Sequence, residues 1–356
     1  MRSSALLGAM IGAAGLLTGC SGEGSGRDDD AGGPGIGSLS QGSNTEGDTE
    51  TGNDSMSSAG TMGVGTMGGS ADDDATSGSL PPKFDLGEQP DAGPPPEEGC
   101  TKVDFLFIID DSGSMNDEQA NLVNSFPGFI TGIQSSLEQV DSYQVGVVTT
   151  DAYSYNIAGC NQLSSLVVQT GGSYSSNANC GPYASGHNYM TEADDLNSTF
   201  ACAAQVGTSG SGQERPMQAM VETVQKVQGG PGQCNEGFIR DDALLVIVII
   251  TDEWDGPNDP EIPGSTGDPQ SWYDAVVAAK LGIPENAVAV ALINYVGSPT
   301  CPPSSAPYDG VHIRDFVNLF GTNGFLGGVC EPDYGPTFAL AVGVIEEACN
   351  NFQPPG

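Results

Sequence analysis

The chain has 356 residues and carries 9 Lys and Arg against 46 Asp and Glu, a formal charge of -37 at pH 7. This balance excludes a nucleic-acid-binding protein, because a phosphate backbone is bound by basic faces. The first hundred residues are poor in large apolar side chains and cannot bury a core. We therefore expect one folded domain, over residues 100–352.

Residues 1–19 are typical of a bacterial lipoprotein signal peptide. One Arg precedes an apolar run that ends in Leu17-Thr18-Gly19-Cys20. This ending resembles the lipobox, in which the Cys becomes the lipid-bearing first residue, so Cys20 is the expected lipidation site; an ordinary signal peptide is the alternative. No later apolar run reaches the ~18 residues of a membrane span. We expect a cell-envelope protein held by its lipid alone, and Ser21 favours the outer membrane, either surface-exposed or facing the periplasm.

Residues 20–99 follow as the lipidated Cys and an acidic linker rich in Gly, Ser and Pro. This composition predicts a disordered tether and no fold. As a Gly-rich random coil, the linker would span about 50 Å. That length would hold the domain clear of a membrane surface.

From residue 100 on, apolar runs alternate with helical patterns. Strands are predicted over residues 103–109, 143–149, 163–168, 243–251 and 287–294. Helices are predicted over residues 115–140, 194–206, 213–227, 269–281, 311–320 and 337–350, the first of them open to a break at Pro127-Gly128. A Cys-rich insertion occupies about residues 159–202. This order predicts an α/β fold, a doubly wound, mostly parallel sheet with helices on both faces and ligand sites at the carboxyl ends of the strands.

Eight cysteines remain after Cys20. They are Cys100, Cys160, Cys180, Cys202, Cys234, Cys301, Cys330 and Cys349. An even number in an exported chain predicts disulfides, and the absence of C-x-x-C spacing argues against a zinc or redox site. We expect Cys330 to pair with Cys349, and Cys160, Cys180 and Cys202 to pair partly among themselves.

Oxygen-bearing side chains follow two of the predicted strands. Asp110, Ser112 and Ser114 come directly after the first strand, and Asp252 follows the apolar strand at residues 243–251. Because the carboxyl ends of parallel strands meet at one edge of a sheet, these side chains should form an oxygen-only shell for Mg²⁺, or for Ca²⁺ or Mn²⁺. The alternative is that Asp110 and Ser112 cap the next helix, with Asp252 in a surface turn.

The strings VDFLFIIDDSGSM and LVIVIITDE resemble the von Willebrand factor type A domain and its metal-ion-dependent adhesion site. The resemblance covers about residues 101–350 and implies a Rossmann-like fold that binds a ligand's acidic side chain through a divalent cation. Residues 83–87, the lipobox and the acidic tether are also similar to secreted lipoproteins of large-genome bacteria such as myxobacteria.

One departure from that family concerns a Thr that completes the metal shell from a middle loop. Counting back from Ala219 and Met220 places Glu214 at this position, whereas the loop's one Thr, Thr208, stands six residues earlier. If Thr208 reaches the ion, the site stays open for a partner's carboxylate. If Glu214 does, its charge weakens that pull and favours a closed, Ca²⁺-like site. Both readings remain open from the sequence.

The expected function is a divalent-cation-dependent binding or adhesion module whose partner is a protein or cell-surface ligand. We expect no enzyme, because the chain has neither a G-x-x-x-x-G-K-S/T phosphate loop nor a G-x-S-x-G elbow. One alternative is an envelope scaffold with a purely structural metal, and a minor one is a metal-dependent hydrolase. A second ion could sit among the acids of residues 252–268.

Overall fold

The computed structural model describes residues 99–137, 140–256, 264–295, 301 and 310–356. The predicted signal peptide, Cys20 and the linker lie outside the described residues, and so do the loop acids Asp259 and Glu261. Within the described ranges, no helix combines the length and the apolar character that crossing a membrane requires.

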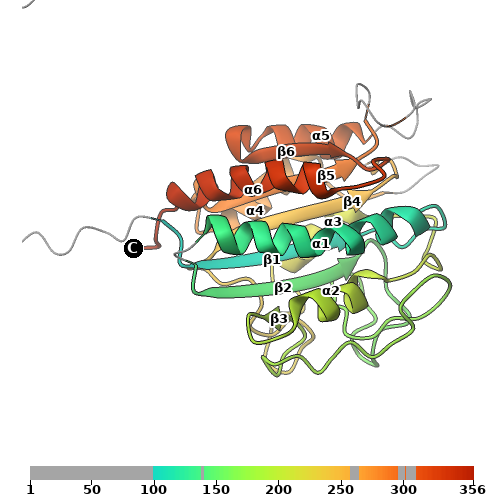
Figure 1. Cartoon of the computed structure of the whole chain (residues 1–356). Helices are drawn as coiled ribbons and strands as arrows, with labels where there is room; N and C mark the ends of the chain where they lie inside the picture. The colour runs from blue at the N-terminus through green and yellow to red at the C-terminus, as the bar shows by residue number, and fades with distance from the viewer. Residues whose placement is uncertain (1–98, 138–139, 257–263, 296–300, 302–309) are drawn as a thin grey trace, which may run out of the picture. The chain divides into compact units, whose positions relative to one another are not determined.

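One mixed sheet forms the centre of the domain (Figure 1). Its strands, within the described residues, are β1 Lys102–Ile109, β2 Ser142–Thr149, β3 Met190–Thr191, β4 Leu244–Thr251, β5 Ala287–Ile293 and β6 Gly324–Gly328. They lie in the order β3-β2-β1-β4-β5-β6, and only the short edge strand β3 is antiparallel to its neighbour. The predicted α/β class with a mostly parallel sheet is confirmed.

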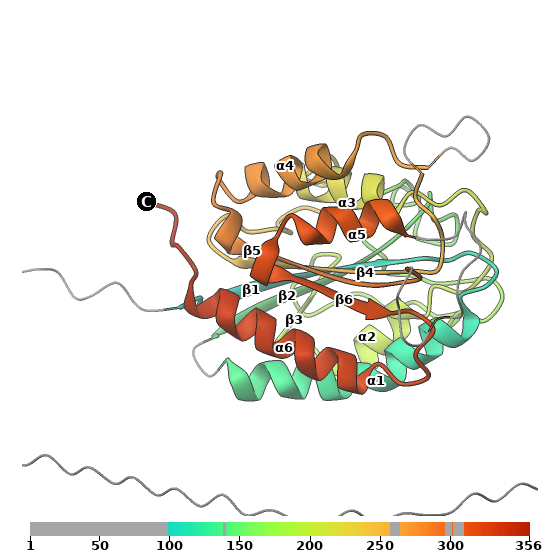
Figure 2. The ribbon, with the colours of Figure 1, turned by 90° about the horizontal axis from the view of Figure 1, so that it is seen from above.

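Helices cover both faces of this sheet (Figures 1 and 2). The described residues form α1 Asn116–Ser136, α2 Leu196–Ala204, α3 Pro216–Val224, α4 Pro269–Ala279, α5 Val311–Asn318 and α6 Gly335–Asn350. One core joins α1, α2 and α6 to residues such as Phe105 and Phe107 of β1, and a second joins α3, α4 and α5 to Leu106 and Ile108. Side chains alternate between the two faces along a strand, so a strand covered on both sides is apolar at most of its positions.

Three local predictions need correction. α1 runs unbroken through Pro127, because Pro127 and Gly128 lie on its exposed side, where water can bind the freed carbonyl. Residues 163–168 are buried but form no strand; the side chains of Asn156 and Asn235 hydrogen-bond much of their backbone instead. The prediction omitted β3, which has two residues, and β6, in which three of five residues are Gly.

All eight described cysteines form disulfides, as predicted, but the expected pair Cys330–Cys349 is wrong. The bridges are Cys100–Cys349, Cys160–Cys234, Cys180–Cys202 and Cys301–Cys330. α6 has 16 residues and is about 24 Å long at 1.5 Å per residue, so it separates Cys330 from Cys349. Of the three cysteines expected to pair partly among themselves, Cys180 and Cys202 do, whereas Cys160 bonds Cys234.

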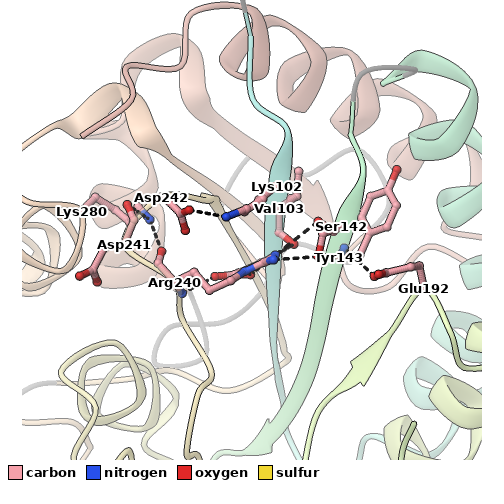
Figure 3. Close-up of polar contacts among 10 residues, drawn as sticks. Lys102, Val103, Ser142, Tyr143, Glu192, Arg240, Asp241, Asp242 and Lys280 are labelled. Carbon is pink, nitrogen blue, oxygen red and sulfur yellow. Dashed lines mark hydrogen bonds and ion pairs between the residues drawn. The ribbon is translucent and has the colours of Figure 1, made fainter. Parts of the chain in front are cut away.

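Basic residues gather at the amino ends of the strands (Figure 3). Arg240 forms an ion pair with the buried Asp104 of β1 at 2.7 Å and also donates to the Ser142 hydroxyl and carbonyl on β2. Buried Lys280 donates to the carbonyl oxygens of Arg240 and Asp241, and Lys102 pairs with Asp242. Lys102, Arg240 and Lys280 therefore have their partners at the amino ends of the strands.

Candidate metal centre

The carboxyl ends of β1 and β4 lie side by side, at the right of Figure 1. Ile109 is in register with Ile250, and the Asp110 amide donates to the Ile250 carbonyl oxygen at 3.1 Å. This pairing brings the loop after β1 next to Thr251 and Asp252, as the sequence predicted for two neighbouring parallel strands.

Asp110 is held by hydrogen bonds at both of its carboxylate oxygens. Its Oδ1 accepts from the Ser112 amide at 2.8 Å, its Oδ2 accepts from the Thr251 hydroxyl, and the residue is fully buried. The hydroxyl oxygens of Ser112 and Ser114 lie 3.3 Å apart, with Ser114 exposed. Burial, reinforced by the nearby Asp252 carboxylate, raises the pKa of Asp110 to about 7 although its hydrogen bonds favour the charged form.

Asp252 faces the same group from β4. Burial raises its pKa, while a hydrogen bond from Ser114 acts in the opposite direction. Its Oδ1 is buried without a hydrogen-bond partner. Asp110, Ser112, Ser114 and Asp252 are therefore brought together, and one carboxylate oxygen of the group is left to accept a further ligand.

Glu214 and Thr208 differ sharply in their surroundings. Glu214 is 6% exposed, accepts from the Thr150 hydroxyl, and leaves its Oε1 buried without a partner. Burial, followed by repulsion from Asp110, raises the pKa of Glu214 to about 10. Thr208 is half-buried, and its amide donates to the Ser173 carbonyl oxygen at 2.9 Å, in the Cys-rich insertion. In this geometry the Glu214 carboxyl is near enough to Asp110 to be repelled by its charge.

Buried Gln119 of α1 holds the loop between α2 and α3, called the middle loop below, against the end of β1. Its Nε2 donates to the carbonyl oxygens of Asp110 at 2.8 Å and Gly207 at 2.9 Å, and its Oε1 accepts from the Gly207 amide at 2.9 Å. Gly207 has a φ of +88°, and a Cβ on it would lie 2.6 Å from the Ser173 carbonyl oxygen. Gly210 donates to the Asp111 carbonyl, where a Cβ would lie 2.5 Å from the Asp111 Cγ. Both positions thus require glycine for close backbone approach.

The sequence reasoning missed Asp111, Thr150 and Asp151. Burial, followed by repulsion from Asp151 and Asp110, raises the pKa of Asp111 to about 8. Thr150 links Asp111 to Glu214, since its hydroxyl lies 3.5 Å from Asp111 Oδ1 and also donates to the Glu214 carboxylate. Thr150 and Asp151 could have been found from the sequence, because they directly follow the predicted strand at residues 143–149, whose carboxyl end lies at the same edge of the sheet.

The donor set suits a hard divalent cation in its chemistry, since it consists of carboxylate and hydroxyl oxygens. Among the described residues, no three His, Cys, Asp or Glu side chains are grouped so that they could hold a metal ion by themselves. The expected shell holds only two carboxylates and depends on Ser112 and Ser114 for the rest. The buried, unpartnered oxygens of Asp252 and Glu214 are the atoms that an ion would satisfy.

Two other loop acids have structural partners. Asp255 accepts from the Met217 amide and from the amide and hydroxyl of Ser265, and so joins the start of α3 to the loop before α4. Asp268 caps α4 by accepting from the Ser271 amide at 2.8 Å. Asp255 and Asp268, two of the acids predicted as candidates for a second ion, thus have hydrogen-bond partners within the described part of residues 252–268.

A hollow of about 530 Å³ opens beside the acidic group. Its lining comprises Asp151, Ala152, Ser211, Gln213, Arg215, Gln218, Gly264 and Thr266. Arg215 is the one base in this lining, and its amide donates to the Thr150 carbonyl oxygen at 2.9 Å.

No protein-family model and no curated protein matches the chain. The fold is similar to two structures of proximal thread matrix protein 1 (PTMP1) from the mussel byssus, each at 11% identity over 70% of this chain, with TM-scores of 0.37 and 0.39 over 49% and 48% of that chain. It is also similar to the pilus adhesin SpaC from Lactobacillus rhamnosus GG in an open conformation, at 11% identity and a TM-score of 0.35 over 71% of this chain and 31% of that one. The chain thus spans about half the length of PTMP1 and a third of SpaC. Similarity at this level identifies neither a family nor a function.

Proposed function

We propose that the described domain is a doubly wound, von Willebrand factor type A-like module that binds a divalent cation and, through it, a protein or cell-surface ligand. Asp110, Ser112, Ser114 and Asp252 supply the cation's ligands. Mg²⁺ is the first candidate ion, with Ca²⁺ and Mn²⁺ as alternatives. The module binds and does not catalyse, and a lipid on Cys20 holds it to the envelope, at the outer membrane.

One observation carries this proposal: the strand ends gather carboxyl groups whose pKa values are raised by burial, and Asp252 and Glu214 each keep one buried oxygen without a hydrogen-bond partner. Four of the six Lys and Arg after residue 100, namely Lys102, Lys226, Arg240 and Lys280, contact carboxylates or carbonyls of residues 104 and 240–242. Mutually repelling acids that lack a basic partner are costly to bury, and a bound dication removes that cost. Exposed Ser114 places one side of the group in contact with solvent, where a partner's acidic side chain could complete the shell.

A second candidate function rests on Glu214. Because Glu214 is buried and interacts with Asp110, it can complete the shell from within the protein. Three carboxylates around one dication leave a net negative site that repels an acidic ligand. The metal would then be structural, and the domain would be a scaffold of the envelope.

Titration calorimetry of the folded domain with MgCl₂, CaCl₂ and MnCl₂ tests cation binding. We expect binding by the native chain and by Asp141→Ala, an exposed acid at the opposite edge of the sheet, but none by Asp110→Ala. Bound cation at a hundredfold excess over Kd should stabilise the native chain by about 2.7 kcal/mol. Absence of heat for all three ions, with melting insensitive to chelator, would refute the proposal.

Glu214→Ala separates the two candidate functions. Retained cation affinity in this variant, with loss in Thr208→Ala, supports the open site that accepts an outside carboxylate. Loss of affinity in Glu214→Ala supports the closed, structural site.

Expression in a lipoprotein-processing bacterium tests the anchor. We expect Cys20→Ala to move the protein from the membrane fraction to the soluble fraction, whereas Ser21→Ala should leave it in the membrane. A covalent lipid contributes about 0.8 kcal/mol per buried CH₂. Unchanged membrane partition of Cys20→Ala would contradict a lipid on this residue.

A further inference from the structure

Residues 152–191 form a stretch without charge in an otherwise acidic domain. These forty residues contain no Lys, Arg, Asp or Glu, although residues 100–356 carry 30 acids and 6 bases. Tyr, Ser, Gly and Asn account for 22 of the forty. The same four residue types are enriched in antibody binding loops, where Tyr supplies contact area and the small polar residues supply adaptable hydrogen bonds. We call this stretch the uncharged segment.

The uncharged segment packs against the middle loop of the candidate metal centre. The Ser173 carbonyl oxygen accepts from the Thr208 amide at 2.9 Å, and the Ser173 amide donates to the Ser209 hydroxyl at 2.9 Å. Gly210, next in the chain, contacts Asp111. The Tyr153 hydroxyl joins the uncharged segment to the middle loop, since it donates to the Val206 carbonyl oxygen and accepts from the Gly171 amide. A partner that reaches the metal centre from this side therefore meets the uncharged segment.

Two tyrosines of the segment are exposed beside this contact. Tyr174 is 68% exposed and Tyr155 is 37% exposed. The Tyr155 ring lies on the backbone of Gly171 and Gly172, where a Cβ would come within 2.6 Å and 3.0 Å of it, and Gly172 precedes Tyr174 by two residues. Aromatic residues of this kind provide much of the binding energy of protein interfaces.

The tyrosines are carried by a braced support. Cys160–Cys234 ties the segment to the chain beyond α3, and Cys180–Cys202 ties it to α2. The Asn156 side chain donates a hydrogen bond to the Leu166 carbonyl oxygen and accepts one from the Val168 amide. A surface that is already ordered loses little conformational entropy when it binds.

We infer that the uncharged segment is the recognition surface of the module, and that it binds a protein partner whose contact face is neutral and polar and carries one acidic side chain for the cation. Because the segment carries no charge, it does not repel the acidic side chain of the partner as the rest of the acidic domain would. A sugar ligand would need a hollow at the tyrosines, but the 530 Å³ hollow beside Asp151 includes neither Tyr155 nor Tyr174 in its lining. This inference rests on the proposed cation-dependent binding and adds the location and chemistry of the ligand contact.

The test uses a display library of random disulfide-constrained peptides, selected on the disulfide-bonded full chain in MgCl₂. Enriched peptides are synthesised, and their Kd values are measured for the native chain, Tyr174→Ser, Tyr155→Ser and the matched control Leu340→Ser. Leu340 is 65% exposed on α6 and lies outside the segment. We expect the Tyr174→Ser and Tyr155→Ser variants to lose about tenfold or more in affinity, as truncation of an interface aromatic does, and Leu340→Ser to lose none.

Four outcomes would overturn the inference. These are enriched peptides that bind both tyrosine variants as well as the native chain, equal loss in Leu340→Ser, failure to enrich any peptide, and tyrosine-dependent binding on a panel of neutral glycans without peptide binding. Repeating the measurements in chelator separates this inference from the proposed function. If binding depends on the tyrosines but survives chelator, the uncharged segment remains the recognition surface and the cation-dependent function is refuted. If binding requires the cation but is unchanged in both tyrosine variants, the cation-dependent function remains and the recognition surface is refuted.

Discussion

Gln119 offers a direct test of how the candidate metal centre is held together. The residue is 2% exposed and makes three hydrogen bonds, to the carbonyls of Asp110 and Gly207 and from the Gly207 amide. Gln119→Met keeps the length of the side chain and removes all three. At about 1 kcal/mol net for each hydrogen bond, the variant should lose about 3 kcal/mol of unfolding free energy. The loss arises because three backbone groups in a buried environment are left without partners.

The matched control is Gln134→Met, the same chemical change on the exposed side of α1. It should change the unfolding free energy by no more than about 0.5 kcal/mol. Urea unfolding without divalent cation, followed by circular dichroism on chains with intact disulfides, measures both variants. Gln119→Met should also weaken Mg²⁺ binding in calorimetry, since Asp110 and the middle loop lose their common support.

Equal stability of the two variants would refute this reasoning. So would a Gln119→Met chain that loses about 3 kcal/mol and still binds Mg²⁺ with native affinity. In the second case Gln119 would stabilise the fold without positioning the site.

Three further predictions test other parts of the structure. The pKa values of Asp110, Asp111 and Glu214 are raised on folding, so the stability linked to them is complete below about pH 4 and is lost as pH rises through about 7, 8 and 10. Cation-free melting temperature should therefore fall between pH 5 and pH 8.5, and Glu214→Gln or added Mg²⁺ should reduce the fall; a flat profile for the native chain would contradict the burial of these acids. Replacing both Cys180 and Cys202 by Ser opens a bridge across 22 residues and should cost about 3 kcal/mol in thermal unfolding, and thiol titration of the unreduced, unfolded native domain should find no free cysteine. Arg240→Met leaves the Asp104 carboxylate buried without its partner and should cost about 3 kcal/mol or more, yet Mg²⁺ affinity should stay native because Arg240 lies at the opposite edge of the sheet; a matching loss of Mg²⁺ affinity would argue against separate edges.

Strands that are marked by a run of apolar residues could be predicted from the sequence. β1 and β4 are apolar at nearly every position, as strands buried on both faces must be, and the predicted ranges match them within a residue. The position of Asp110 and Asp252 followed from the same reasoning, because each stands directly after a strand. Where local character is weak the prediction was incomplete: β6 is mostly Gly, and the buried residues 163–168 satisfy their backbone through Asn156 and Asn235.

The amino-acid sequence by itself was enough to predict an α/β domain with a mostly parallel sheet, and to place four oxygen-bearing side chains directly after two of its strands. Only the tertiary structure decided which distant residues join them. Nothing in the spacing of Gln119 and Gly207, 88 residues apart, indicates the three hydrogen bonds between them and the end of β1. The same holds for Cys100 and Cys349, separated by 249 residues, and for the contact of Thr150 with Glu214. Periodicity and capping act over a few residues, whereas these contacts depend on how whole strands and helices pack, so they become fixed only when the chain has folded.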